Sequence, residues 1–141
     1  MRILGVGADL CDIRRLEREL TAPQRGFVDA VFTGTEIAVC RADRSPSRRF
    51  AEHFAAKEAV LKALAFADGR GTFWREVEIV HDGNGKAEAR LRGRLGMLAE
   101  DHAAGRIHLS LAAAGHHALA VAMIEERGGP APRPDTNHTG D

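Results

Sequence analysis

The sequence predicts an α+β fold, in which a series of helices comes first and mostly antiparallel strands follow. In the first half, after a short strand, apolar residues recur at helical spacing, most clearly over residues 46–67. In the second half, apolar residues alternate with others over residues 76–81 and again over 107–111, as in strands. The sequence Asp82-Gly-Asn-Gly85 between two strand-like runs predicts a hairpin.

Composition indicates one domain with an ordinary core. The chain has 141 residues, of which 28% are charged and 44% hydrophobic, and its formal net charge is zero. A balanced charge gives no bulk attraction to nucleic acids or membranes. Two cysteines, Cys11 and Cys40, are too few for a disulfide framework and suit a reducing cytoplasm. The sequence has no run of membrane-span length and no signal-peptide pattern, so we expect a cytoplasmic protein.

Residues 2–10 alternate as a strand whose two faces differ in chemistry. One face carries Leu4, Val6, Ala8 and Leu10, and the other carries Gly5, Gly7 and Asp9. Asp9 therefore lies at the end of a glycine-lined face, where a backbone can approach a ligand closely. The alternative is that Asp9 or Asp12 only caps the helix that follows.

Three helices are expected between this strand and residue 46. The first covers about residues 12–20 and turns Ile13, Leu16 and Leu20 inward, while its outer side carries Arg14, Arg15 and Arg18. An arginine ridge of this kind is either a solvated surface or a docking face for an acidic partner. A second helix is expected over residues 23–31. A third begins at Thr33, because Thr33 and Glu36 have the spacing of a capping box.

The long helix begins near Pro46, a residue favoured in a first helical turn, and is predicted to run to about Ala67. Its apolar side carries Phe50, Phe54, Leu61 and Leu64. Lys57 projects into the middle of this apolar stripe, Glu58 lies at its edge and Lys62 lies one turn further on, although burying an unpaired charge is costly. Two interpretations stay open. Either Glu58 and Lys62 form a surface pair while Lys57 extends its amine to water, or the charges hold a metal and a phosphate at a crevice.

The C-terminal half is predicted to consist mainly of strands. In order, the sequence predicts a loop over 68–72, strands over 77–81 and 86–92, a helix over 94–103, and strands over 107–111 and 118–125. The last two strands are joined by a turn at Gly115-His-His117. We expect one domain over residues 1–126 and a disordered tail over residues 127–141, since the final segment is rich in proline and glycine and has no aromatic side chains.

Several short motifs occur in the order and spacing typical of one enzyme family. They are Gly5-Val-Gly-Ala-Asp9, Phe32-Thr-Gly-Thr-Glu36, Phe54-Ala-Ala-Lys-Glu-Ala-Val-Leu-Lys62, Trp74-Arg-Glu-Val-Glu-Ile79 and Asp82-Gly-Asn-Gly-Lys86. Over residues 1–126 the chain resembles the holo-acyl-carrier-protein synthases, the small trimeric class of 4′-phosphopantetheinyl transferases. No single motif is decisive, but their combination at these separations is specific.

The resemblance implies an activity and an architecture. Such enzymes transfer the 4′-phosphopantetheine arm of coenzyme A to a serine of an apo acyl carrier protein, require Mg²⁺ and release adenosine 3′,5′-bisphosphate. They serve fatty-acid or polyketide biosynthesis. Their fold is a small, mostly antiparallel sheet packed on a long helix, and they form homotrimers with active sites at subunit interfaces. The implied partners are an acyl carrier protein and coenzyme A, with no nucleic acid and no membrane.

By the same resemblance, Asp9 and Glu58 hold Mg²⁺, which takes oxygen ligands and usually only one or two protein carboxylates. Lys62 contacts the pyrophosphate and stabilises the charge that develops there, and Glu58 accepts the serine proton, directly or through a metal-bound water. Asp9, Glu58 and Lys62 are thus the expected catalytic residues. The positions expected to bind the nucleotide are Lys62, Lys57, His53, Ala65 and Asn84, and those expected to bind the carrier protein are Arg14, Arg15 and Arg18.

The chain departs from the family pattern at three places near the expected nucleotide site. Ala65-Phe-Ala67 stands where Gly-Thr-Gly is common, His53 stands where arginine is often found, and Ala113 stands at the position of a histidine. Side chains at residues 65–67 would crowd a phosphate, and histidine binds a phosphate more weakly than arginine at neutral pH. We therefore expect weakened coenzyme A binding or turnover. The alternative is a catalytically impaired relative that still binds carrier protein or coenzyme A.

Two further interpretations rank lower. His116 and His117 either replace the missing histidine or bind a transition metal with His108 or His102, but no Cys/His spacing supports such a metal site. A nucleic-acid binder would use basic residues of the long helix that do not share one face, and the balanced charge argues against it. These residues are Arg44, Arg48, Arg49 and Lys57. Trp74 is interpreted as a core or interface residue.

Overall fold

The computed structural model describes residues 1–22, 26–67 and 70–129, and it confirms the predicted α+β class. Helices dominate the first half of the described chain and strands the second, with one strand at the very start. The elements are β1 (Ile3–Asp12), α1 (Ile13–Thr21), α2 (Gly26–Val31), α3 (Gly34–Ala42), α4 (Pro46–Ala63), β2 (Val77–His81), β3 (Ala87–Leu91), α5 (Gly93–Asp101), β4 (Ala104–Ala114) and β5 (His117–Glu126). Two short 3-10 helices, η1 (Arg70–Thr72) and η2 (Trp74–Glu76), precede β2.

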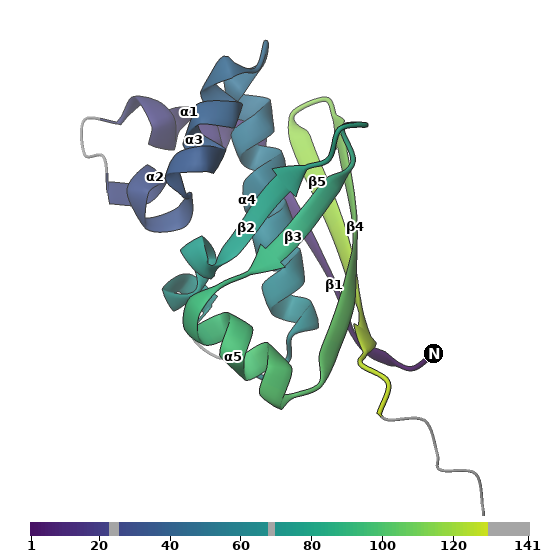
Figure 1. Cartoon of the computed structure of the whole chain (residues 1–141). Helices are drawn as coiled ribbons and strands as arrows, with labels where there is room; N and C mark the ends of the chain where they lie inside the picture. The colour runs from purple at the N-terminus through teal and green to yellow at the C-terminus, as the bar shows by residue number, and fades with distance from the viewer. Residues whose placement is uncertain (23–25, 68–69, 130–141) are drawn as a thin grey trace, which may run out of the picture.

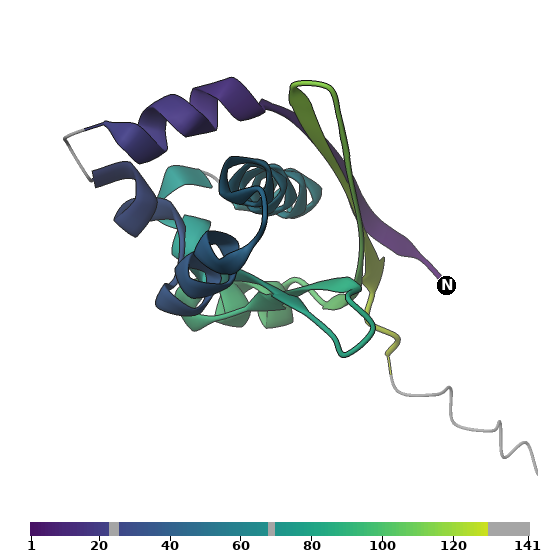
Figure 2. The ribbon, with the colours of Figure 1, turned by 90° about the horizontal axis from the view of Figure 1, so that it is seen from above.

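Two antiparallel sheets pack around the long helix α4. The first has the strand order β1-β5-β4, and the second is the hairpin formed by β2 and β3. The hairpin lies on one side of α4 and the three-stranded sheet on another (Figure 1). Seen nearly end-on, α4 is surrounded by the three-stranded sheet, the hairpin and α1 (Figure 2). Because most residues of α4 are buried, this helix forms the centre of the core.

The glycine-lined face of β1 exists because the strand crosses α4 at close range. A Cβ atom at Gly5 would lie 1.9 Å from the carbonyl oxygen of Ala63, and one at Gly7 would lie 2.1 Å from that of Ala59. Only glycine therefore fits at these two positions. The close approach is made to the helix backbone, and it turns the same face of β1, including Asp9, toward α4.

Helix α4 ends at Ala63, four residues before the predicted end, so that boundary was wrong. At Leu64 the chain leaves the helical conformation and enters a turn closed by a hydrogen bond from the Ala67 N–H to the Leu64 carbonyl, at 2.8 Å. The alanine-rich sequence favours a longer helix, but Leu64 and Ala67 are both buried in the core. Tertiary packing of these side chains overrides the local helix propensity.

Most other predicted elements are present, with shifted boundaries. The capping box at Thr33 and Glu36 is formed, and Asp12 caps α1 by accepting from the Arg14 N–H. β4 begins earlier than predicted, and residues 70–72 form a 3-10 turn where a loop was expected. The start of the second predicted helix and most of the predicted disordered tail lie outside the described residues. Among those residues, no helix is both long and apolar enough to cross a membrane.

Candidate functional site

Asp9 and Glu58, which are far apart in the sequence, line the same cavity. It has a volume of about 510 Å³ and lies between the end of β1, α1, α4 and η2. Asp9 reaches it because the glycine face of β1 is turned toward α4, and Glu58 reaches it from the middle of that helix. Other side chains that line the cavity include Cys11, Arg15, Phe54, Trp74 and His117.

Lys62 is bound to Asp9, a contact that the surface-pair interpretation did not include. Its Nζ atom donates to the Asp9 Oδ1 atom at 2.9 Å and to the Ala8 carbonyl at 3.1 Å. This pair joins α4 to β1, and the Lys62 side chain is partly exposed. The structure thus places two carboxylates and one ammonium group, the three predicted catalytic groups, within one region.

The Glu58 carboxylate is held by an aromatic side chain. The Trp74 Nε1–H donates a hydrogen bond to the Glu58 Oε1 atom at 2.5 Å, from η2 to α4. Sequence interpretation assigned Trp74 to the core or an interface and missed this contact. The signal was present, since a partly buried indole N–H generally finds a hydrogen-bond acceptor, but nothing in the sequence identified Glu58 as that acceptor.

The two carboxylates fit a small divalent cation. Mg²⁺ takes oxygen ligands and commonly uses one or two protein carboxylates, with water and substrate phosphates completing its octahedron. Asp9 and Glu58 offer that donor set from two separate elements lining one cavity. Within the described ranges, no cluster of three or more histidine, cysteine, aspartate or glutamate side chains is arranged to hold a metal.

Cys11 lies in the same cavity but is not suited to act as a nucleophile. Burial, reinforced by the negative charge of Asp9, raises the pKa of the Cys11 thiol to about 11. The thiol is therefore protonated at neutral pH, whereas the thiolate is the reactive form of cysteine. The chemistry of the cavity consequently rests on its carboxylates and on the nearby cations.

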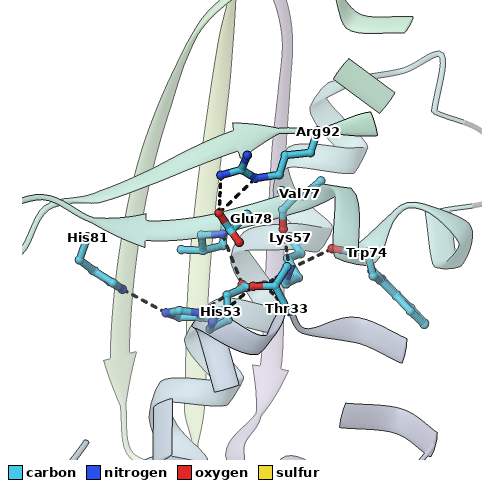
Figure 3. A network of polar contacts seen from close by, with 10 residues as sticks. Thr33, His53, Lys57, Trp74, Val77, Glu78, His81 and Arg92 are labelled. Carbon is cyan, nitrogen blue, oxygen red and sulfur yellow. Dashed lines mark hydrogen bonds and ion pairs between the residues drawn. The ribbon is translucent and has the colours of Figure 1, made fainter. Parts of the chain in front are cut away.

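Lys57 lies on a different face of α4 and is entirely buried. Its Nζ atom donates to the Glu36 Oε1 atom at 2.7 Å, to the Trp74 carbonyl at 2.9 Å and to the Val77 carbonyl at 2.5 Å (Figure 3). All three ammonium donors are thereby used within the protein. The expected contact of Lys57 with a phosphate is not supported by this burial, and the alternative in which its amine extends to water is wrong.

Glu36 is the counter-ion that the sequence did not reveal. Burial alone would raise the pKa of Glu36, but hydrogen bonds from His53 and Lys57 and the positive charge of Lys57 outweigh it and hold that pKa below its usual value. The carboxylate also accepts from the backbone N–H groups of Thr33 and Ile79. Glu36 is thus both the last residue of a capping box and a buried anion.

His53, a predicted nucleotide contact, is also buried and faces the same network. Its Nδ1 atom lies 3.3 Å from the Glu36 Oε2 atom, and its Nε2 atom lies 3.0 Å from the His81 Nε2 atom (Figure 3). Burial lowers the pKa of His53 and outweighs the opposing effect of the hydrogen bond that its ring donates to Glu36. A neutral, enclosed imidazole is a poor ligand for a phosphate.

The remaining predicted nucleotide positions lie away from the Asp9–Glu58 cavity. Asn84 is exposed in the β2–β3 turn, where Asp82 accepts from its backbone N–H at 2.8 Å. Ala65 is exposed in the turn after α4, and Ala113 is exposed near the end of β4. None of these three side chains lines the cavity. Their roles as nucleotide contacts stay predictions.

The arginine ridge on α1 borders the cavity. Arg15 lines the cavity, and Arg18 is exposed one turn further along the helix. Arg14 is engaged by Asp12, and its hydrogen bonds to that carboxylate hold the pKa of Asp12 at about 2. Within the ridge, the exposed positive charge next to the cavity is therefore supplied mainly by Arg15 and Arg18.

Three of the four basic residues invoked for a nucleic-acid surface are paired or buried, while Arg44 is exposed. Arg48 and Arg49 both pair with Asp43 and Glu52. Lys57, the fourth cation of that interpretation, is buried. Paired and enclosed cations contribute little to the exposed positive stripe that binds a phosphate backbone.

Comparisons with known proteins agree on one family. Residues 5–122 match the model of the 4′-phosphopantetheinyl transferase superfamily. The chain is 43% identical over 129 residues to a holo-[acyl-carrier-protein] synthase of Methylobacterium sp. strain 4-46, and the match covers 87% of this chain and 94% of that protein.

Solved structures of the same family are similar to this chain. The crystal structure of holo-[acyl-carrier-protein] synthase from Neisseria meningitidis is similar with a TM-score of 0.78 and 29% identity, covering 87% of this chain and 98% of that one. The ACPS–CoA complex from Chronobacterium ammoniagenes is similar with a TM-score of 0.74 and 26% identity, covering 88% of this chain and 98% of that one.

Proposed function

Because the chain belongs to the 4′-phosphopantetheinyl transferase superfamily, we propose that it transfers the 4′-phosphopantetheine arm of coenzyme A to a serine of an apo acyl carrier protein. The reaction would release adenosine 3′,5′-bisphosphate, depend on Mg²⁺ and serve fatty-acid or polyketide biosynthesis. The observation that carries this proposal is that Asp9 and Glu58, from distant parts of the chain, line one cavity, and that Lys62 is bound to Asp9. Two free, buried cysteines are consistent with a cytoplasmic enzyme.

The chemistry demands positioned charge rather than a covalent enzyme intermediate. Asp9 and Glu58 would hold Mg²⁺, which when bound neutralises charge on the pyrophosphate. Glu58 accepts the proton of the serine hydroxyl as the serine oxygen forms its bond to phosphorus. The bond from that phosphorus to the bridging oxygen breaks, and adenosine 3′,5′-bisphosphate leaves. Lys62 is one helical turn from Glu58, and its ammonium donates to the pyrophosphate oxygens during this displacement.

The carrier protein would dock on the arginine ridge. Acyl carrier proteins present an acidic helix, and Arg15 and Arg18 supply exposed positive charge directly beside the cavity. Charge complementarity of this kind favours encounter and sets orientation. It would bring the acceptor serine to the side of the cavity where Glu58 lies.

We also propose that the chain assembles as a homotrimer through the outer face of its three-stranded sheet. That face is apolar yet exposed: Val6 and Leu10 are 60% and 62% exposed, and Leu119 and Val121 are 42% and 40% exposed. A contiguous exposed apolar patch is typical of an interaction surface. Light scattering should give about three times the molar mass of the chain, whereas a monomer would contradict the trimer.

Mass spectrometry of a carrier protein tests the proposed activity. After incubation with the wild-type chain, coenzyme A and Mg²⁺, an apo carrier protein should gain about 340 Da, the mass of the transferred arm. A carrier whose acceptor serine is replaced by alanine should gain nothing. If the intact carrier gains no mass while calorimetry still detects coenzyme A binding, the chain is instead the impaired relative expected from Ala112-Ala-Ala114.

A further inference from the structure

The indole of Trp74 stands at the boundary between the core and the candidate site. Its Nε1–H donates to the Glu58 Oε1 atom at 2.5 Å, and the ring lines the same cavity as Asp9 and Glu58. A hydrogen bond to a ligating carboxylate fixes which way that carboxylate points. Trp74 is therefore placed to control the orientation of Glu58.

The ring itself is held by aromatic packing. Its centroid lies 5.9 Å from that of Phe54 and 6.5 Å from that of Phe27, with interplanar angles of 54° and 64°. Gly71 closes another side, since a Cβ atom there would lie 3.5 Å from the indole carbons. Tilted and edge-on contacts at these separations are favourable. The packing limits rotation of the ring and so keeps the N–H directed at Glu58.

The backbone of Trp74 is anchored by the residue next to Glu58 on the same helix. The Lys57 ammonium donates to the Trp74 and Val77 carbonyls (Figure 3), and its charge is balanced by the buried carboxylate of Glu36. Consecutive residues of α4 thus hold the two ends of Trp74: Lys57 holds its carbonyl and Glu58 holds its indole. The buried Lys57–Glu36 ion pair fixes the backbone between Trp74 and Val77, and this backbone in turn fixes the position of the indole.

We propose that Trp74 is a positioning residue for Glu58, which it reaches from a segment clamped by the buried Lys57–Glu36 pair. The inference rests on the proposed role of Glu58 as a metal ligand. It also gives the buried ion pair a part in the site: Lys57 acts through Trp74 and does not touch substrate. Loss of an outer-shell partner of a metal ligand typically lowers metal affinity or activity about 10- to 100-fold.

A spectroscopic test of the contact does not need turnover. Trp74 is the only tryptophan, so the chain has a single indole N–H resonance. In ¹⁵N-labelled protein, Glu58→Ala should move this resonance upfield and speed its exchange with water, because the acceptor is lost. Asp9→Asn changes a residue of the same cavity that is not the acceptor of the indole N–H, so it should leave the resonance in place. An indole resonance unchanged by Glu58→Ala would overturn the inference even if the enzyme is active.

A kinetic test separates positioning from packing. Trp74→Phe keeps an aromatic ring but removes the N–H donor, so the Mg²⁺ concentration for half-maximal rate should rise about 10-fold while the KM for carrier protein changes little. Phe27→Leu is the matched control, because Phe27 packs on the indole but makes no polar contact with Glu58. An unchanged Mg²⁺ dependence in Trp74→Phe, or an equal change in Phe27→Leu, would overturn the proposal. Failure of the wild-type chain to modify any carrier protein would instead overturn the proposed function.

Discussion

Replacing Lys57 by methionine should lower the free energy of unfolding by about 3–5 kcal/mol, the range seen when one partner of a buried ion pair is removed. The substitution keeps the length of the side chain but removes all three ammonium hydrogen bonds. It leaves the Glu36 carboxylate buried without its cation, and the carbonyls of Trp74 and Val77 without their donor. Chemical denaturation at one fixed protein concentration measures the change, since assembly contributes to the stability of an oligomer.

Two comparisons make the Lys57 result specific. Arg2→Met breaks the exposed pair between Arg2 and Glu126 and should cost less than about 1 kcal/mol, because surface pairs contribute little. Adding Glu36→Gln to Lys57→Met should recover part of the lost stability by removing the unpaired charge. A loss in Lys57→Met no larger than that in Arg2→Met would show that the buried pair does not support the fold.

Replacing either cavity carboxylate by its amide should lower the transfer rate about 100-fold or more. Asp9→Asn and Glu58→Gln keep size and hydrogen-bonding capacity but remove the charge that binds a cation. Because loss of an outer-shell partner already costs about 10- to 100-fold, loss of a direct ligand should reach at least the upper end of that range. The rate of carrier-protein modification, followed by mass spectrometry, measures the effect.

The control for the carboxylate variants is Asp101→Asn, which removes an exposed charge at the end of α5, outside the cavity. It should retain the wild-type rate. Circular dichroism should show the same secondary structure in all three variants. A wild-type rate in Glu58→Gln would remove both the metal-ligand role and the proton-acceptor role assigned to that residue.

Local patterns predicted those parts of the fold that local physics decides. Alternation located β1, the Thr33–Glu36 spacing located the start of α3, and the Asp-Gly-Asn-Gly sequence located the β2–β3 turn. The end of α4 was predicted wrongly because the packing of Leu64 and Ala67 against distant residues, not the helix propensity of alanine, decides where the helix stops.

The candidate site was only partly predictable for a related reason. The family resemblance selected Asp9, Glu58 and Lys62, and the glycine face of β1 explains physically why Asp9 is turned toward α4. The partners of those residues depend on contacts between distant segments. A lysine in an apolar stripe requires an anion, but the sequence offers many acidic side chains and does not single out Glu36. For the same reason it did not link Trp74 to Glu58.

Direct binding of Mn²⁺, which shares the oxygen-ligand preference of Mg²⁺, tests the central claim that Asp9 and Glu58 together form one cation site. Electron paramagnetic resonance of free Mn²⁺ in the presence of coenzyme A should reveal one bound ion per wild-type chain. Both Asp9→Asn and Glu58→Gln should lose most of this binding, while Asp101→Asn should keep it. Wild-type Mn²⁺ binding by both carboxylate variants would contradict the claim.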